Sequence, residues 1–216
     1  TQLFDIHAQT AHTFLKNLDT KEGNKVLAHL ESRGLTRETI KKFKLGYSLK
    51  QKDALLLAFR TESVRSDAMQ QSGLFIDTKN GYMDRFRGRI MFSISNSAGK
   101  IAAFAGRVFE SDDPAKYINS PETPIYNKSK IFYGLHETKQ IIRNSKSVIV
   151  VEGYLDFLQL YQSGIHNIVA VSGTAFTDQH ALQIKRFCEK VHLAYDGDSA
   201  GKAAAIRAGY VLLRAG

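Results

Sequence analysis

The sequence predicts an α/β protein in two parts, a basic mixed α/β part followed by a largely parallel sheet with helical crossovers. Three observations support this prediction. Short apolar runs at 148–151, 168–171 and 191–195 alternate with segments of helical period. Near residue 82 the hydrophobic period changes to two. All three prolines lie between residues 114 and 124, where we expect an extended connector to divide the chain.

Four helical segments are expected in the first part. Gly34 follows the second segment and suits a left-handed C-terminal cap. Thr36 precedes the third segment and suits an N-cap. The stretch LGYSLKQKD, between the third and the fourth, is rich in turn residues and predicts a loop. The expected helices cover residues 4–18, 21–31, 37–43 and 54–59.

A β-hairpin is expected next, because RFRGRIMFSI and IAAFAGRVF flank the polar turn SNSAGK. On a strand, Arg85, Arg87 and Arg89 would share one face at intervals of about 6.6 to 6.8 Å, close to the spacing of phosphates in an extended single strand. This pattern favours a phosphate-binding groove, which Arg107 would extend. The alternative is a half-exposed sheet whose wet face happens to carry arginines.

The connector is basic and aromatic rather than a plain solvated linker. KYINSPETPIYNKSK combines lysines and tyrosines with the small hydrogen-bonding side chains of Asn119 and Ser120. This mixture suits contacts to phosphates and stacking on bases. The basic and aromatic residues are Lys116, Tyr117, Tyr126, Lys128 and Lys130.

Carboxylates follow two of the predicted parallel strands. Glu152 comes directly after the run at 148–151, and Asp196 and Asp198 follow the run at 191–195. Strand ends of this kind share one sheet edge, and Asp156 lies one helical turn beyond Glu152. Such oxygen ligands suit Mg²⁺ or Mn²⁺ and phosphoryl chemistry. The alternative is that these residues form turns and helix caps.

The turn at Gly173 and Thr174 follows the second strand at the same edge. Its backbone N–H groups and the helix that follows suit a phosphate. The equally good alternative is an ordinary turn with Thr177 as the N-cap.

Composition narrows the class of protein. The 216 residues are 43% hydrophobic, which fills a core and excludes disorder. The single cysteine, Cys188, excludes an intrachain disulfide and a multi-cysteine zinc site. A net charge of +9 favours a polyanionic partner. No apolar run is long enough to span a membrane and no signal peptide is evident, so we expect a soluble intracellular protein.

Two motifs of the second part, VVEGYLD at 150–156 and DGDSAG at 196–201, resemble the TOPRIM metal-binding fold of primases, topoisomerases and some nucleases. Four further segments resemble, in order and spacing, the RNA-polymerase core of bacterial DnaG-type replicative primases. These are SRGLTRETIKKFKLGY at 32–47, DRFRGRIMF at 84–92, AGRVF at 105–109 and KYINSPETPIYNKSKIFYGL at 116–135.

The resemblance implies roles for particular residues. Glu152, Asp196 and Asp198 would be the essential acidic residues, and Asp156 would support them in holding Mg²⁺ or Mn²⁺. Contacts to template or nucleoside triphosphate would come from Arg33, Arg107, Lys116, Tyr117, Asn119 and Lys128. Ser93 departs from the family, which often has proline there.

The resemblance also implies an organisation. Residues 1–110 would form a basic N-terminal subdomain of the primase core, 111–146 a basic connector, and 147–216 a TOPRIM subdomain. The family has a further acidic cluster beyond the last TOPRIM helix, so we expect this subdomain to be truncated and weakly active or inactive. A zinc-ribbon domain and a helicase-binding domain are also expected outside this sequence.

The predicted function is therefore template-directed synthesis of RNA primers from ribonucleoside triphosphates on single-stranded DNA, in the cytoplasm at the replication fork. Replicative helicase and single-strand-binding protein would be partners through other parts of the full-length protein. Two alternatives stay open. One is another TOPRIM enzyme, a nuclease or a topoisomerase fragment; the other is a non-catalytic module that binds single-stranded DNA.

Overall fold

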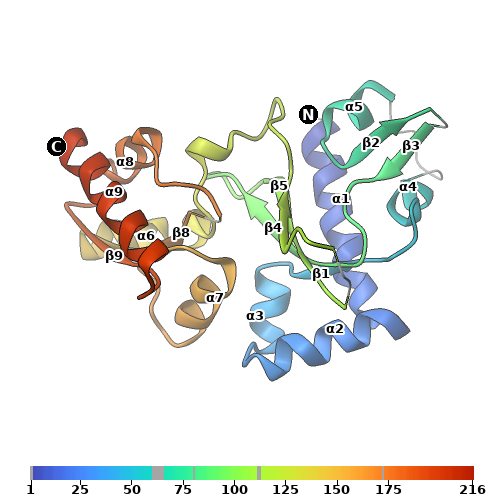
Figure 1. The fold of residues 1–216 in the computed structure, drawn as a ribbon, viewed down its shortest axis with the longest axis horizontal. Coiled ribbons are helices and arrows are strands. Elements are labelled where there is room, and N and C mark those ends of the chain that lie inside the picture. The colour runs from blue at the N-terminus through green and yellow to red at the C-terminus, as the bar shows by residue number, and fades with distance from the viewer. Residues whose placement is uncertain (1, 60–65, 80, 111–112, 172) are drawn as a thin grey trace. The chain divides into compact units, whose positions relative to one another are not determined.

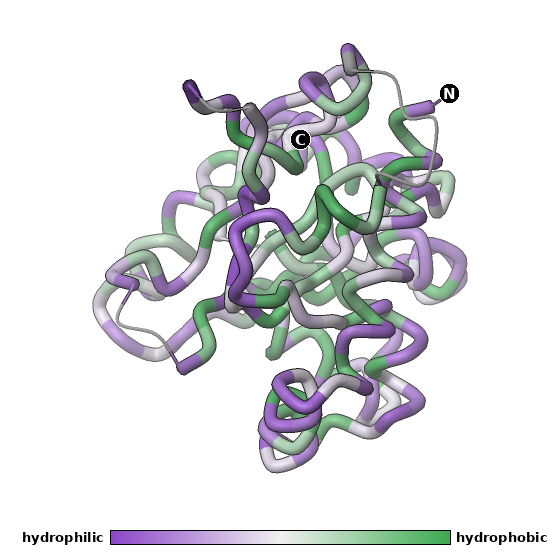
Figure 2. The backbone as a smooth tube through the Cα atoms, turned by 90° about the vertical axis from the view of Figure 1, so that its right-hand side faces the viewer, coloured by the Kyte–Doolittle hydropathy of each residue, from purple (hydrophilic) through white to green (hydrophobic). Residues whose placement is uncertain are grey.

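The chain folds into two compact units in the computed structural model (Figure 1). Unit 1 comprises residues 1–94 and 100–126, and unit 2 comprises residues 95–99 and 127–216. The structure describes residues 2–59, 66–79, 81–110, 113–171 and 173–216. Residues 111 and 112, at the start of the predicted connector, lie outside the described residues. Hydrophobic and hydrophilic stretches alternate along the chain in Figure 2, as expected when each element buries one side.

The helices of unit 1 begin and end close to the predicted positions. Thr20 and Thr36 act as N-caps, because their hydroxyl oxygens accept hydrogen bonds from the N–H groups of Gly23 and Thr39. Gly34 has φ +88°, the left-handed conformation expected of it. The helices are α1 (Gln2–Lys16), the 3₁₀ turn η1 (Asn17–Asp19), α2 (Lys21–Ser32), α3 (Arg37–Lys42), α4 (Ala54–Phe59) and α5 (Ser66–Gln71).

Unit 1 has a four-stranded sheet in the order β1-β4-β5-β6 and a separate two-stranded hairpin, β2-β3. Phe14 of α1 packs edge-on against Phe104 of β5, with ring centroids 5.4 Å apart, so the helix covers the sheet. The loop predicted at LGYSLKQKD contains the short strand β1, which its turn residues did not indicate. The strands are β1 (Gly46–Ser48), β2 (Phe75–Thr78), β3 (Gly81–Asp84), β4 (Arg89–Ser95), β5 (Ile101–Val108) and β6 (Tyr117–Asn119).

The predicted strand through Arg85, Arg87 and Arg89 is wrong in its first half. Residues 85–88 form a loop between β3 and β4, and only Arg89 lies on a strand. Gly88 has φ +61°, which breaks the extended conformation, and its N–H donates to the Ser48 carbonyl oxygen at 2.8 Å. The three arginines therefore do not form an evenly spaced exposed row.

Unit 2 contains the predicted parallel sheet, with strand order β8-β7-β9. Val150 of β7 pairs with Val169 of β8 and with Leu193 of β9, both in parallel register. The predicted α/β class is confirmed, and α6, which was not predicted, precedes β7. The elements are the 3₁₀ turn η2 (Lys128–Lys130), α6 (Leu135–Ser145), β7 (Ser147–Val151), α7 (Tyr154–Gln162), β8 (Ile168–Ala170), α8 (Asp178–Ile184), β9 (Lys190–Ala194) and α9 (Ser199–Ala215).

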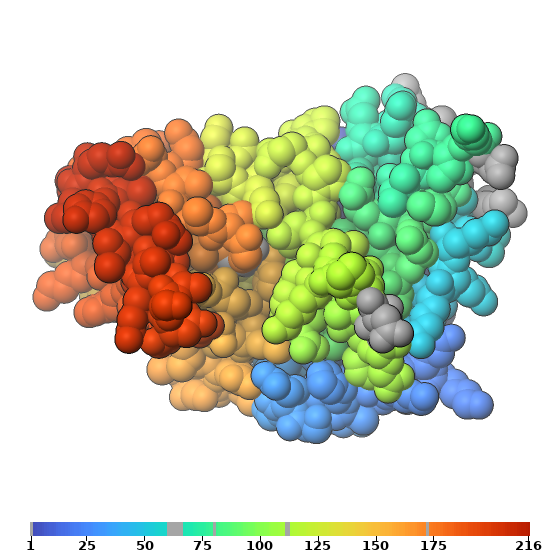
Figure 3. Space-filling view, viewed as in Figure 1, coloured from blue at the N-terminus to red at the C-terminus, as the bar shows by residue number. Residues whose placement is uncertain are grey.

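The last helix, α9, keeps an apolar stripe in solvent. Ile206, Tyr210 and Leu213 are 62%, 65% and 79% exposed, and Figure 3 shows the red helix at the surface. Across the described residues, no helix combines the length and the apolar character that crossing a membrane requires.

Candidate functional site

An acidic edge forms where β7 and β9 end. Glu152 follows the last residue of β7, and Asp196 lies two residues beyond the end of β9. The backbone N–H of Asp196 donates a hydrogen bond to Glu152 Oε1 at 2.9 Å. This bond joins the loops of two adjacent parallel strands, as the shared-edge argument predicts.

The other two acidic residues each hold a helix terminus. Asp156 Oδ2 accepts a hydrogen bond from the Gly153 N–H at 3.2 Å, at the start of α7. Asp198 is the N-cap of α9, and its Oδ1 accepts from the Gly201 N–H at 2.7 Å. Capping, which the sequence left open as an alternative, thus uses one oxygen of each carboxylate. The second oxygen of each remains available for other ligands.

Gly201 explains why the acidic loop can sit so close to α9. A Cβ atom at this position would lie 2.2 Å from the Asp196 carbonyl oxygen. Only glycine allows the first turn of the helix to pack directly against the Asp196 backbone. The glycine of the DGDSAG motif therefore places the helix against the carboxylate-bearing loop.

The chemistry of these donors fits a divalent cation. Glu152, Asp196 and Asp198 offer carboxylate oxygens, the ligands that Mg²⁺ and Mn²⁺ prefer. Among the described residues, however, no three His, Cys, Asp or Glu side chains form a group that could hold a metal ion.

A cavity of about 610 Å³ adjoins the acidic edge within unit 2. Glu152, Gly173, Thr174 and Tyr195 are among its lining residues. Burial, reinforced by the Glu152 carboxylate, raises the pKa of Tyr195 to about 12, so its phenol stays neutral. Thr174 Oγ1 donates to the Val171 carbonyl oxygen at 2.6 Å, which ties the turn to the end of β8.

The segment beyond β8 also contains the N-cap that the sequence offered as the alternative to a phosphate site. Thr177 Oγ1 accepts from the His180 N–H at 3.1 Å and is the N-cap of α8. Gly173 and Thr174 therefore line the cavity while Thr177 begins the helix.

Three predicted nucleic-acid residues lie together on β5 and β6. Arg107 is the register partner of Tyr117, and Asn119 is the partner of Ala105. Lys116 immediately precedes β6, and its carbonyl oxygen accepts from the Val108 N–H at 2.9 Å. The strand pairing thus gathers Arg107, Lys116, Tyr117 and Asn119 in one region of unit 1.

Arg33 and Arg107 share a neighbour, His29. Burial, followed by the positive charges of Arg107 and Arg33, lowers the pKa of the His29 imidazole. Both arginines therefore act electrostatically on the same side chain of α2. His29 was not predicted as part of this region, because nothing in its sequence neighbourhood marks it.

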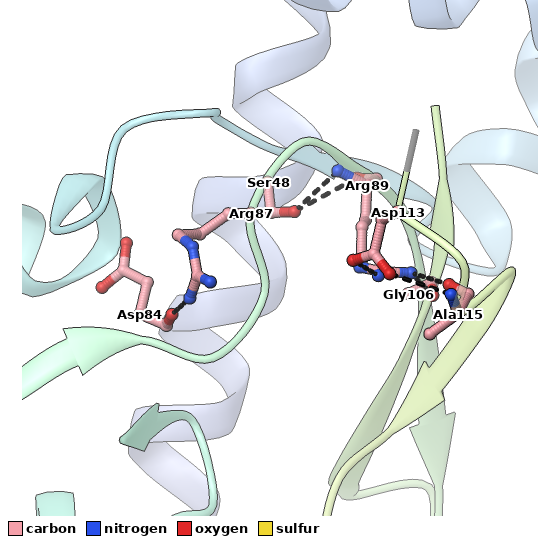
Figure 4. A network of polar contacts seen from close by, with 7 residues as sticks. All are labelled: Ser48, Asp84, Arg87, Arg89, Gly106, Asp113 and Ala115. Atoms are coloured by element: carbon pink, nitrogen blue, oxygen red, sulfur yellow. Dashed lines mark hydrogen bonds and ion pairs between the residues drawn. The ribbon is translucent and has the colours of Figure 1, made fainter. Parts of the chain in front are cut away.

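Arg87 and Arg89 have different surroundings (Figure 4). Arg89 is buried; its Nη1 donates to the carbonyl oxygens of Gly106 at 3.1 Å and Ala115 at 2.9 Å, and its Nη2 donates to Asp113. Arg87 is half-buried, and its Nη1 donates to the Asp84 carbonyl oxygen. The interpretation of Arg89 as an exposed phosphate ligand is wrong, because three groups of the protein already occupy its guanidinium.

Lys128 lies on η2 in unit 2, on a turn that the fold holds firmly. Asn127 Oδ1 accepts from the Ser129 N–H at 3.1 Å, and Thr177 Oγ1 donates to the Ser129 carbonyl oxygen at 2.7 Å. His180 Nε2 lies 3.3 Å from the Ile131 carbonyl oxygen. Thr177 and His180 thus anchor the lysine turn to α8, a contact that sequence patterns do not reveal.

Comparison with known proteins gives a consistent result. The sequence profile of the N-terminal domain of the DNA primase catalytic core matches residues 13–139, and that of the Toprim domain matches residues 146–216. The chain is 36% identical over 214 residues to the DNA primase of Listeria monocytogenes, covering 98% of this chain and 34% of that protein. It spans about a third of the length of the curated relatives it matches.

Comparison with solved structures also finds DNA primases. A crystal structure of a DNA primase domain from Pseudomonas aeruginosa has a TM-score of 0.91 at 37% identity, covering 98% of this chain and 66% of that one. A structure described as the DnaG primase catalytic domain bound to ssDNA has a TM-score of 0.85 at 35% identity, covering 96% of this chain and 65% of that one.

Proposed function

The chain belongs to the family of DnaG-type primase catalytic cores with a Toprim domain, and from that premise we propose that it joins ribonucleotides into RNA primers on a single-stranded DNA template. The observation that carries the proposal is the hydrogen bond from the Asp196 N–H to Glu152 Oε1. It joins the acidic ends of two parallel strands, where open sheets of this kind bind ligands.

We propose that Glu152, Asp196 and Asp198 hold Mg²⁺ or Mn²⁺, with Asp156 in support. Toprim primases generally depend on a divalent metal. Bound there, the cation would lower the pKa of the attacking 3′-hydroxyl and neutralise charge on the leaving pyrophosphate. The backbone bonds of Glu152 and Asp198 fix the direction of their carboxylates before any ligand arrives.

The basic residues of unit 1 and the η2 turn would bind the template and the triphosphate. Arg107 and Lys116 would supply charge, Tyr117 a stacking surface, and Asn119 a hydrogen-bonding amide. Arg33, Arg85, Arg87 and Lys128 complete the proposed set. The similar DnaG catalytic domain bound to ssDNA supports a single-stranded template for this chain.

The wider setting is also a proposal. Replicative helicase and single-strand-binding protein would be partners of the full-length protein through regions outside this sequence, with action in the cytoplasm at the replication fork. The organisation proposed from the sequence has a basic N-terminal subdomain at residues 1–110, a connector at 111–146 and a TOPRIM subdomain at 147–216. The boundary between the two structural units falls inside that connector, between residues 126 and 127.

Primer synthesis tests the proposal directly. Labelled ribonucleoside triphosphates, single-stranded DNA and Mg²⁺ or Mn²⁺ are incubated with this chain and, in parallel, with a chain extended to the length of the relatives. We expect the extended chain to make RNA products that depend on the DNA and are lost in Glu152→Gln, and the shorter chain to make few or none. Glu137→Gln, an exposed carboxylate on α6, is the matched control and keeps the products.

Failure has distinct forms. DNA hydrolysis without nucleotides would indicate a nuclease. Intact single-strand binding without products from either chain would indicate a binding module and would overturn the primase proposal.

A further inference from the structure

A cavity of about 550 Å³ in unit 1 lies beside the loop of residues 85–88. Most of the side chains that line it carry charge. The cations are Lys50, Arg85, Arg87 and Arg89, and the anions are Glu110 and Asp113. Its composition differs from that of the cavity at the acidic edge, whose lining includes the apolar residues Val171, Phe176, Ala208 and Val211.

Two of these charges neutralise each other. Arg89 is almost fully buried and pairs with Asp113, while its other hydrogen bonds go to the Gly106 and Ala115 carbonyl oxygens. The Ala115 N–H and the Arg89 charge lower the pKa of Asp113, so this carboxylate stays ionised. Lys50, Arg85 and Arg87 are left facing Glu110, an excess of two positive charges.

Within the described residues, Arg85 forms no ion pair. Its side chain is half-buried, and its Nε is buried without a hydrogen-bond partner in that part of the chain. Burial lowers the pKa of the Arg85 guanidinium, which shows that its charge is partly removed from water. An anion beside it would offset this desolvation.

Arg87 is also without an acidic partner among the described ion pairs, although Asp84 is close in sequence. The Arg87 guanidinium donates to the Asp84 carbonyl oxygen rather than to its carboxylate (Figure 4). The carboxylate of Asp84 instead accepts the N–H groups of Leu55 and Leu56 at the start of α4. The Asp84 carboxylate is thus committed to a helix terminus, and it and Asp113 act on Arg87 only through longer-range electrostatics.

Lys50 lies over the loop from the other side. A Cβ atom on Gly88 would come within 3.3 Å of Lys50 Cγ, so the lysine stem crosses the glycine. Its ammonium is exposed and joins the two arginines in lining one cavity. The three cations therefore converge on one place instead of following a strand at regular intervals.

We propose that Lys50, Arg85 and Arg87 form one phosphate-binding pocket, which takes a compact phosphate-bearing group rather than a row of successive phosphates. Its phosphates come either from the triphosphate of a free nucleotide or from the backbone of a single strand. The choice of these two sources rests on the proposed function; the existence of an anion site rests on the charges and burial described above.

Equilibrium binding tests the pocket with two probes, inorganic triphosphate and a labelled oligothymidylate of about 12 nucleotides. Affinities are measured for the chain as it stands, for Lys50→Gln and Arg87→Gln, and for Lys79→Gln as a charge-matched control. Lys79 is exposed in the turn between β2 and β3 and does not line the cavity. Thermal melting checks that Arg87→Gln stays folded, and exposed Lys50 provides a second variant that leaves buried contacts intact.

We expect Lys50→Gln and Arg87→Gln each to weaken binding about tenfold, and Lys79→Gln to have little effect. Weaker binding of both probes assigns the pocket to a free polyphosphate, with which the strand competes. Weaker binding of the oligonucleotide alone assigns it to backbone phosphates. Equal small losses in all three variants would overturn the proposal, because only overall charge would then matter. Both affinities are measured without divalent cation and without turnover, so failure of the pocket is distinguishable from failure of primer synthesis.

Discussion

The acidic edge of unit 2 and the arginine segment of unit 1, residues 85–89, were both predicted from residue spacing. Spacing predicted the side-chain positions correctly at the acidic edge and incorrectly in the arginine segment. At the acidic edge, each carboxylate lies within two residues of a strand end or at the start of a helix, so chain position determines side-chain position. Arg85, Arg87 and Arg89 are evenly spaced in sequence, yet Arg87 donates to the Asp84 carbonyl oxygen at the end of β3 and Arg89 is buried on β4. Alternation predicts a shared face only while the backbone stays extended, and Gly88 ends that condition.

The largest effect expected concerns the acidic edge. Gly201→Ala places a Cβ 2.2 Å from the Asp196 carbonyl oxygen, so the start of α9 must move. We expect the free energy of unfolding to fall by more than about 4 kcal/mol. Gly209→Ala, in the same helix with nothing within 4 Å, is the control and stabilises by about 1 kcal/mol. Chemical denaturation of both variants measures the difference; equal effects would refute the close packing.

The arginine segment at residues 85–89 gives the next effect. Arg89→Ala leaves the Gly106 and Ala115 carbonyl oxygens and the Asp113 carboxylate without their shared donor. We expect a loss of about 3 kcal/mol in the free energy of unfolding. Arg87→Ala removes one hydrogen bond and costs about 1 kcal/mol. Urea unfolding compares the two, and a larger loss for Arg87→Ala would contradict the assignment of Arg89 as structural.

The two units are expected to respond to pH in opposite directions. In unit 1, burial raises the pKa of Asp84 to about 6. The contribution of Asp84 to the free energy of unfolding is therefore full below about pH 4 and is lost as pH rises through 6. In unit 2, burial lowers the pKa of His180 to about 4, so its contribution is full above pH 6.5 and is lost as pH falls towards 4. Each of these groups changes the free energy of unfolding by about 3 kcal/mol across its pH range.

Hydrogen exchange read separately in each unit between pH 4 and pH 6.5 checks this contrast. Across that range, protection in unit 1 falls with rising pH and protection in unit 2 rises. Asp84→Asn and His180→Gln each flatten the pH dependence of their own unit only. Parallel pH profiles in the two units would sink the prediction.

The smallest effect should be the same in both units. Arg37–Glu31 in unit 1, at 2.7 Å, and Arg214–Asp178 in unit 2, at 3.2 Å, are ion pairs of exposed side chains. Because solvent screens such pairs, Glu31→Gln and Asp178→Asn should each change stability by no more than about 0.5 kcal/mol. Thermal melts at low and high salt measure this, and a loss above about 1 kcal/mol in either would show that solvent does not screen that pair.

The sequence predicted the α/β class, the parallel sheet and the shared edge of Glu152 and Asp196, because these follow from local period and from the order of elements. It did not predict the burial of Arg89, which depends on Gly106 lacking a side chain. A Cβ there would lie 2.9 Å from Arg89 Cδ, although the two residues are 17 positions apart. The role of Lys50 was missed for the same reason, since its proximity to Gly88 arises only in the folded chain.

Because of the hydrogen bonds at the acidic edge, backbone amide signals of this chain can report on ligand binding to the carboxylates. The carboxylates of Glu152, Asp156 and Asp198 each accept a backbone N–H, from Asp196, Gly153 and Gly201 respectively. A cation that binds a carboxylate changes the chemical shift of the amide proton that donates a hydrogen bond to that carboxylate. Labelling glycine alone with nitrogen-15 would therefore report separately on Asp156 and Asp198 during a titration. Cation binding could then be followed one carboxylate at a time, without nucleotide, template or turnover.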